Sequence, residues 1–113
     1  MAGAARFNDP VQGTTAGEHS GHGMNPHPPL TFTGEISGGC SSNVFINGIA
    51  AATKDSVTTE RDSCCGSSNG SVAVGSSSVF INGKPAARIG DALNAHSGAG
   101  AIIGGSGDVL IGG

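Results

Sequence analysis

The stretch SSSVFING, residues 76–83, decides how this chain folds, because the chain repeats it. Residues 41–48 read SSNVFING, and residues 106–113 read SGDVLIGG, which is a third and more divergent copy. Their valines, Val44, Val79 and Val109, are 35 and then 30 residues apart. Internal similarity at spacings of this size is typical of repeat architectures. Three copies in one short chain therefore predict a pseudo-threefold object.

Each copy closes a longer unit that has the pattern of a β-hairpin. Residues 70–83 contain a β-branched run, a Gly/Ser turn and a second apolar strand that ends in Asn-Gly, and residues 34–48 and 100–113 follow the same plan. Gly and Asn tolerate the positive φ of tight turns. Because a lone hairpin is marginal in water, we expect three hairpins to pack around a common axis. The predicted fold is all-β, a small pseudo-threefold cone of three repeated hairpins.

The second strand of each unit is apolar throughout, a pattern typical of strands that are covered on both faces. We therefore expect Phe45 and Phe80 to pack between neighbouring hairpins. The other residues expected to be buried are Val44, Ile46, Val79, Ile81, Val109 and Ile111.

The composition allows one domain with a thin core. The chain has 113 residues, 21 glycines, four Phe and neither Trp nor Tyr, so a staple other than a large core is expected. A net charge of −3 with only five basic residues argues against nucleic acid. The start, MAGAARFNDP, lacks the apolar segment of a secretory signal. We expect synthesis in the cytoplasm without a signal peptide.

Soft metal ligands fall between the predicted hairpins. Histidines 19, 22 and 27 precede the first hairpin, Cys64 and Cys65 lie between the first and second, and His96 lies between the second and third. Threefold topology brings the ends of these connectors together, where imidazole and thiolate groups suit four-coordinate zinc. The alternatives are solvated histidines and small buried cysteines. Cys40 stands at a hairpin turn where the other copies have glycine, and it is left out of the ligand set.

A further shared segment follows the first two copies. Residues 84–91 read KPAARIGD, whereas residues 49–55 read IAAATKD, with Ala50 in place of Pro and Thr53 in place of Arg. Here the chain resembles the PAAR-repeat proteins, the spike tips of contractile injection machines such as type VI secretion systems and phage tails. The resemblance predicts a flexible arm over residues 1–18 and a PAAR-repeat domain over residues 19–113.

The resemblance also implies one structural zinc per chain, held near the tip by three His and one Cys. Carried over to this sequence, the ligands are His22, His96 and one of Cys64 or Cys65. The fourth is His19 or His27. We favour His19, because its spacing from His22 sets both rings beside one turn.

The function that the resemblance implies is a structural tip, not an enzyme. Such a tip caps a trimeric β-helical spike, one copy per trimer, at the end of a secreted spike or virion tail, and touches the target membrane only transiently. One alternative is an adaptor that links effector cargo to the spike. Another is a small zinc hydrolase, disfavoured because four protein ligands leave no open position for water. The G-x-S-x-G match at residues 66–70 lacks the strand-to-helix context of a nucleophile elbow.

Overall fold

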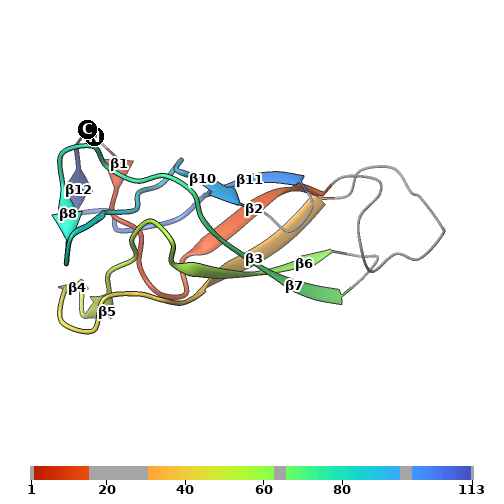
Figure 1. Cartoon of the computed structure of the whole chain (residues 1–113), viewed down its shortest axis with the longest axis horizontal. Coiled ribbons are helices and arrows are strands. Elements are labelled where there is room, and N and C mark those ends of the chain that lie inside the picture. The colour runs from red at the N-terminus through yellow and green to blue at the C-terminus, as the bar shows by residue number, and fades with distance from the viewer. Residues whose placement is uncertain (1, 16–30, 63–65, 95–97, 113) are drawn as a thin grey trace.

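The computed structural model describes residues 2–15, 31–62, 66–94 and 98–112, and every regular element in these ranges is a β-strand (Figure 1). No helix long and apolar enough to cross a membrane occurs among them. The strands are β1 (Ala2–Gly3), β2 (Pro10–Thr15), β3 (Thr31–Gly38), β4 (Phe45–Ile46), β5 (Ile49–Ala50), β6 (Val57–Asp62), β7 (Gly66–Val72), β8 (Phe80–Ile81), β9 (Lys84–Pro85), β10 (Ala92–Asn94), β11 (Gly98–Ile102) and β12 (Leu110–Ile111). The predicted all-β class is confirmed.

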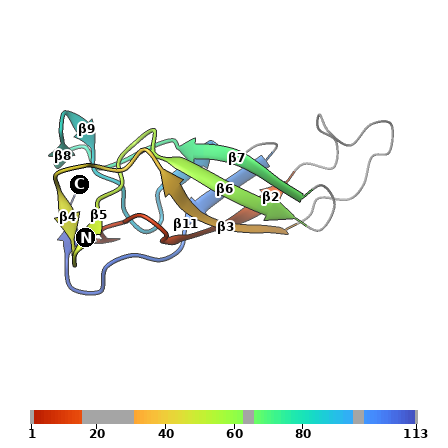
Figure 2. The same cartoon turned by 90° about the horizontal axis from the view of Figure 1, so that it is seen from below.

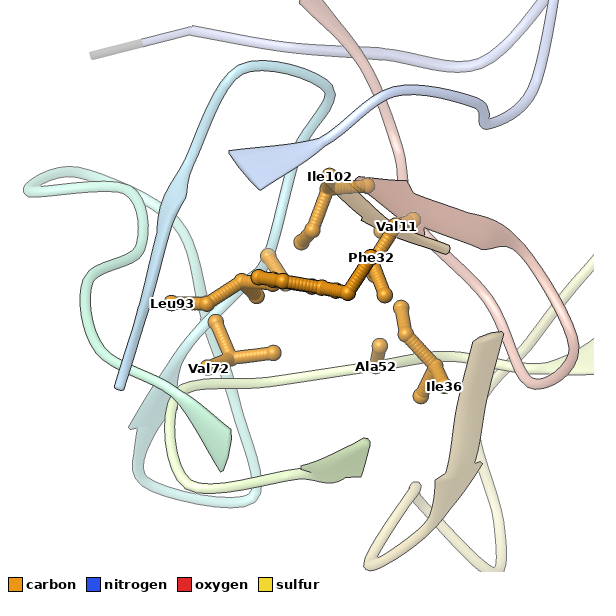
Figure 3. Packing of buried hydrophobic residues seen from close by; sticks show 9 residues of the cluster. Val11, Phe32, Ile36, Ala52, Val72, Leu93 and Ile102 are labelled. Carbon is orange, nitrogen blue, oxygen red and sulfur yellow. The ribbon is translucent and has the colours of Figure 1, made fainter. Parts of the chain in front are cut away.

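Six of the strands form a closed antiparallel barrel in the order β10-β11-β2-β3-β6-β7. Its interior is filled by Phe32 and by aliphatic side chains from neighbouring strands (Figure 3). Glycines make room for the aromatic ring, since a Cβ at Gly13 or Gly100 would lie only 2.6 or 2.7 Å from ring atoms of Phe32. In a chain with so few large side chains, one aromatic ring thus occupies the centre of the barrel and aliphatic side chains fill the rest.

The remaining strands form three two-stranded ribbons, β4–β5, β8–β9 and β12–β1, which lie together at one end of the barrel (Figures 1 and 2). In the first two ribbons the turn is Asn-Gly with both residues at positive φ, 53° and 77° at Asn47-Gly48 and 53° and 83° at Asn82-Gly83. This is the turn geometry that tight hairpins favour.

The predicted strand pairing is therefore wrong in one respect. The VFI strands were expected to pair with the strands before them, but β4 and β8 pair with the residues after the Asn-Gly turn. The preceding residues extend into β3 and β7 of the barrel, where longer antiparallel partners take up their backbone groups. Each repeat thus contributes to the barrel and to a ribbon.

The N-terminus completes the third repeat. Strand β1 pairs with β12, and the segment that follows, residues 4–9, corresponds to residues 51–56 and 86–91 of the other repeats. Isolated bridges join the three segments in a ring, Ala4 to Arg88, Arg6 to Ala51 and Thr53 to Ala86. The expectation of a flexible arm over residues 1–18 therefore fails for residues 2–15, because β1 and β2 are built into the ribbons and the barrel.

Burial in the ribbons alternates along the chain. Ile46, Ile81 and Ile111 are buried as expected, and they form a second apolar cluster with Ala4, Ala51 and Ala86. Their neighbours were predicted wrongly: Phe45 and Phe80 are 58% and 57% exposed, Val79 and Val109 are exposed, and Val44 is only partly buried. Phe45 and Phe80 are exposed because a two-stranded ribbon covers the core with one face only, and successive side chains point to opposite faces. The valines lie just outside the ribbon strands, so this alternation does not govern them.

Candidate functional site

The strand pairs β2–β3, β6–β7 and β10–β11 have their connected strand ends at the end of the barrel opposite the ribbons (Figures 1 and 2). Their last described strand pairs are Thr14 with Thr31, Asp62 with Gly66, and Asn94 with Ala99. Thr15 and Gly98 also pair, so the strand ends that precede and follow two of the candidate ligand segments are adjacent. The third pair of strand ends is offset, because Asn94 pairs with Ser71, five residues along β7 from Gly66.

The candidate ligands themselves, His19, His22, His27, Cys64, Cys65 and His96, lie outside the described residues. The ligand set therefore stays a prediction. Among the described ranges no group of three or more His, Cys, Asp or Glu side chains is placed to hold a metal.

A buried carboxylate lies on β6, in the half of the barrel away from the ribbons. Glu60 is 2% exposed, and the Thr58 hydroxyl donates a hydrogen bond of 3.0 Å to its Oε2. On the neighbouring strand Gly70 leaves space for the carboxylate, because any Cβ there would overlap Glu60 Oε2. Sequence reasoning missed this group. The available signal was the spacing of Thr58 and Glu60, because residues two apart in a strand share one face.

The ribbon end carries an apolar ring, defined here as Phe45, Phe80 and Leu110. Each comes from a different ribbon and from the same position of its repeat, and each is more than half exposed. Three large exposed apolar side chains on one end of a small protein are typical of an interaction surface.

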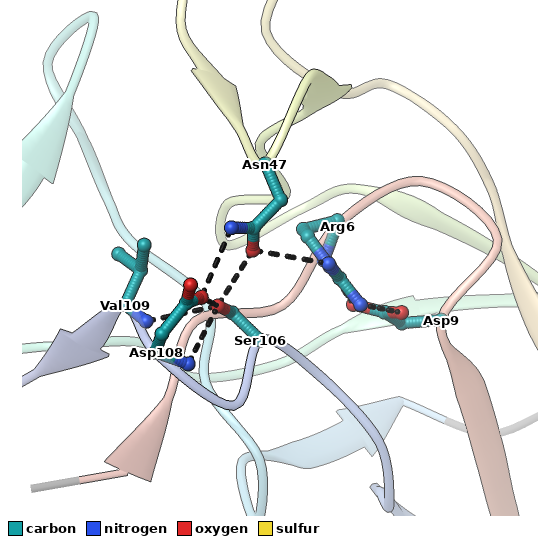
Figure 4. A network of polar contacts seen from close by, with 6 residues as sticks. All are labelled: Arg6, Asp9, Asn47, Ser106, Asp108 and Val109. Atoms are coloured by element: carbon teal, nitrogen blue, oxygen red, sulfur yellow. Dashed lines mark hydrogen bonds and ion pairs between the residues drawn. The ribbon is translucent and has the colours of Figure 1, made fainter.

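Serine hydroxyls join each repeat to the next. Ser41, Ser76 and Ser106 each accept a hydrogen bond of 2.9 Å from the backbone N–H three residues later. The same three hydroxyls also contact the ribbon turn of the following repeat, at Asn82, Gly112 and Asn47 respectively. Figure 4 shows the junction at Ser106, which donates to Asn47 Oδ1 at 2.7 Å.

Arginine strengthens two of the three junctions. Arg6 and Arg88 each form a two-pronged ion pair with an aspartate three residues later, Asp9 or Asp91. The free guanidinium nitrogen of each crosses to the next repeat, where Arg6 donates to Asn47 Oδ1 at 3.2 Å (Figure 4) and Arg88 donates to Gly112 O at 3.3 Å. The arginine therefore has a structural role here, linking one repeat to the next.

Local charges and burial affect two further groups. Hydrogen bonds from Asn47 and Ser106 hold the pKa of Asp108 below its usual value, so the carboxylate stays ionised beside Arg6. Burial raises the pKa of the Cys40 thiol, which packs against the barrel core and remains protonated.

A closed barrel with three junction-linked ribbons defines a single-chain, pseudo-threefold β-repeat protein. The PAAR motif matches residues 27–95, well over half of the chain, and the protein belongs to this family. PAAR proteins are spike-tip proteins of contractile injection machinery, a structural family located at the ends of secreted spikes. No protein of curated function gives a significant match to the chain.

Proposed function

We propose that this chain caps a trimeric β-helical spike, with one copy bound per trimer. The observation that carries the proposal is the apolar ring of Phe45, Phe80 and Leu110, which offers a threefold partner three similar contacts from one chain. The three ribbons are separate two-stranded sheets among the described residues. Exposed strand edges invite pairing with another chain, and strand addition is a recurrent way to join such edges.

The capping proposal predicts a defined stoichiometry and a defined contact. Light scattering on the purified complex should give the mass of one chain plus one spike trimer. The double variant Phe45→Asp, Phe80→Asp should abolish binding, because it buries two charges without partners in an apolar contact. Its melting temperature should stay near that of the parent, since both side chains are exposed.

The control for the capping experiment is Ile103→Asp, which places the same charge on an exposed apolar residue outside the ribbons. It should bind the spike normally. Three copies per trimer, or full binding by the double variant, would contradict the proposal.

We further propose that one structural zinc staples the barrel end opposite the ribbons. The support is the donor chemistry of the His and Cys residues, the position of the strand ends that lead to them at one end of the barrel (Figures 1 and 2), and the thin core. The proposed ligands are His19, His22, His96 and one of Cys64 or Cys65, with His27 as the alternative to His19. Zinc bound by four protein ligands would link the hairpins in addition to their strand pairing in the barrel.

The zinc proposal predicts about one zinc per chain after purification without added metal, measured by elemental analysis. Of Cys64→Ser and Cys65→Ser, one should lose zinc and melt at a lower temperature. Cys40→Ser is the matched control and should keep its zinc. Full zinc content in both single variants would show that the cysteine assignment is wrong.

A non-enzymatic role follows from the same proposals, because a metal with four protein ligands leaves no position for an activated water. The adaptor alternative loses much of its support, since residues 2–15 are incorporated into the fold and do not form a free docking peptide. We propose that the chain is made in the cytoplasm and leaves the cell on the spike, touching the target membrane only transiently.

A further inference from the structure

The junction between ribbons β4–β5 and β8–β9 differs from the other two. Thr53 and Ser56 take the places that Arg and Asp occupy in the other repeats. A cavity of about 180 Å³ lies there, between Thr53 and Asn82. At the junction shown in Figure 4 the corresponding residues are Arg6 and Asn47, and there the Arg6 guanidinium donates a hydrogen bond to Asn47 Oδ1. The remaining lining residues are Gly39, Cys40, Ser41, Ser42, Ile81 and Lys84.

One of the lining residues, Thr53, carries a buried hydroxyl. Thr53 is 4% exposed, and within the described part of the chain its hydroxyl has no hydrogen-bond partner. The nearby Ser56 hydroxyl is already committed, since it accepts from the Thr53 backbone N–H at 2.9 Å and donates to Gly39 O at 3.2 Å. Buried polar groups in native proteins are nearly always paired. An unpaired one in a cavity wall therefore points to a ligand.

The charge of the lining selects the kind of ligand. Lys84 and Ser42 are both exposed, and among the described residues neither side chain forms an ion pair or a hydrogen bond. Among the described residues no Asp or Glu lines the cavity, whereas Asp9 and Asp91 neutralise the arginines of the other two junctions. A cation would find no counter-charge here, but an anion would find an ammonium group and hydroxyl donors.

The size and position of the cavity limit the source of that anion. Pockets for drug-sized molecules measure roughly 300–1,000 Å³, so this cavity suits one side chain or a small ion. Its wall residue Ile81 follows Phe80 of the apolar ring directly in the chain. A protein that docks on the ring therefore passes close to the cavity.

We propose that this cavity, the carboxylate pocket, receives one Asp or Glu side chain from the spike. Lys84 pairs with the carboxylate, and the Thr53 hydroxyl donates to it. The source of the carboxylate rests on the proposed capping function, whereas the chemistry of the pocket does not. At the other two junctions an Arg–Asp ion pair occupies the positions of Thr53 and Ser56, so we expect the pocket to hold one spike subunit of three.

The test begins with the free chain and uses acetate as the probe, with acetamide as its neutral counterpart. In ¹H–¹⁵N spectra, acetate should shift the amide signals of Thr53, Asn82 and Lys84 in a saturable way, and acetamide should not. Lys84→Gln should weaken acetate binding about tenfold, since a charge-assisted hydrogen bond is lost. Lys54→Gln is the matched control, because it removes the one other lysine of the chain and should leave acetate binding unchanged. Absence of saturable shifts, or equal effects of the two lysine variants, would overturn the pocket.

A second arm identifies the source of the carboxylate. In the complex with the spike, acetate should no longer shift the pocket signals, because the partner's side chain occupies the pocket. If acetate binds as well in the complex as to the free chain, the spike as source is refuted and a free small carboxylate is the ligand. Failure to form the complex would count against capping alone, since the first arm needs no spike.

Discussion

Replacing Phe32 with alanine is expected to lower the free energy of unfolding by about 3–5 kcal/mol. Phe32 is 1% exposed and fills the centre of the barrel, where glycines on two neighbouring strands approach its ring (Figure 3). Removing the ring leaves a cavity that Gly13 and Gly100 have no side chains to fill. Since a small domain has a total stability of only about 5–15 kcal/mol, urea unfolding should show a large shift of the midpoint.

The matched control for Phe32→Ala is Phe80→Ala, which makes the same substitution at an exposed site of the apolar ring. We expect it to change the free energy of unfolding by no more than about 0.5 kcal/mol. Equal destabilisation by the two variants would mean that the ribbons, and not the barrel, hold the core together.

Replacing Gly34 with alanine is expected to destabilise the barrel at or beyond the upper end of the usual 1–3 kcal/mol range for overpacking. A Cβ at this position would overlap the carbonyl oxygen of Thr59 on the paired strand β6 and lie 2.8 Å from its carbonyl carbon. Backbone atoms of a paired strand cannot rotate away as a side chain can. The variant should melt well below the parent or be recovered unfolded, as judged by circular dichroism.

Gly107→Ala is the control for the Gly34 substitution, because a Cβ there meets nothing within 4 Å and the other two repeats already carry Ser42 and Ser77 at this position. Its effect should stay within about 0.5 kcal/mol. If Gly34→Ala is equally mild, strands β3 and β6 are not as close as described.

The sequence by itself determined the class of the fold. β-Branched runs, Asn-Gly pairs and threefold repetition are local features, and local features specify strands, turns and repeat number without long-range information. The KPAARIGD stretch was likewise enough to identify the family, which the motif match over residues 27–95 confirms.

Which strands pair was decided by the tertiary structure. Strand β4 could pair either with the residues after the Asn-Gly turn or with the longer strand before it. Local sequence does not distinguish the two pairings, because each leaves a strand edge that the rest of the chain must pair. The closure of six strands into a barrel decides between them, because it provides the preceding strand with two long neighbours. Tertiary structure also recruits β1, which pairs with β12 to form the third ribbon. Its two residues carry no strand signal of their own, although Ala4-Ala5-Arg6 repeats Ala86-Ala87-Arg88.

The exposed apolar ring and the carboxylate pocket were also beyond the sequence. Phe45 and Phe80 read as core residues because hydrophobicity alone does not show on which face of a ribbon a side chain lies, and a one-residue step reverses that face. Thr53 read only as a departure from the family pattern. The sequence determined that an arginine is missing from this repeat, but only the packing of one repeat against the next shows that its place is a cavity, because the residues that line it are up to 45 positions apart, from Gly39 to Lys84.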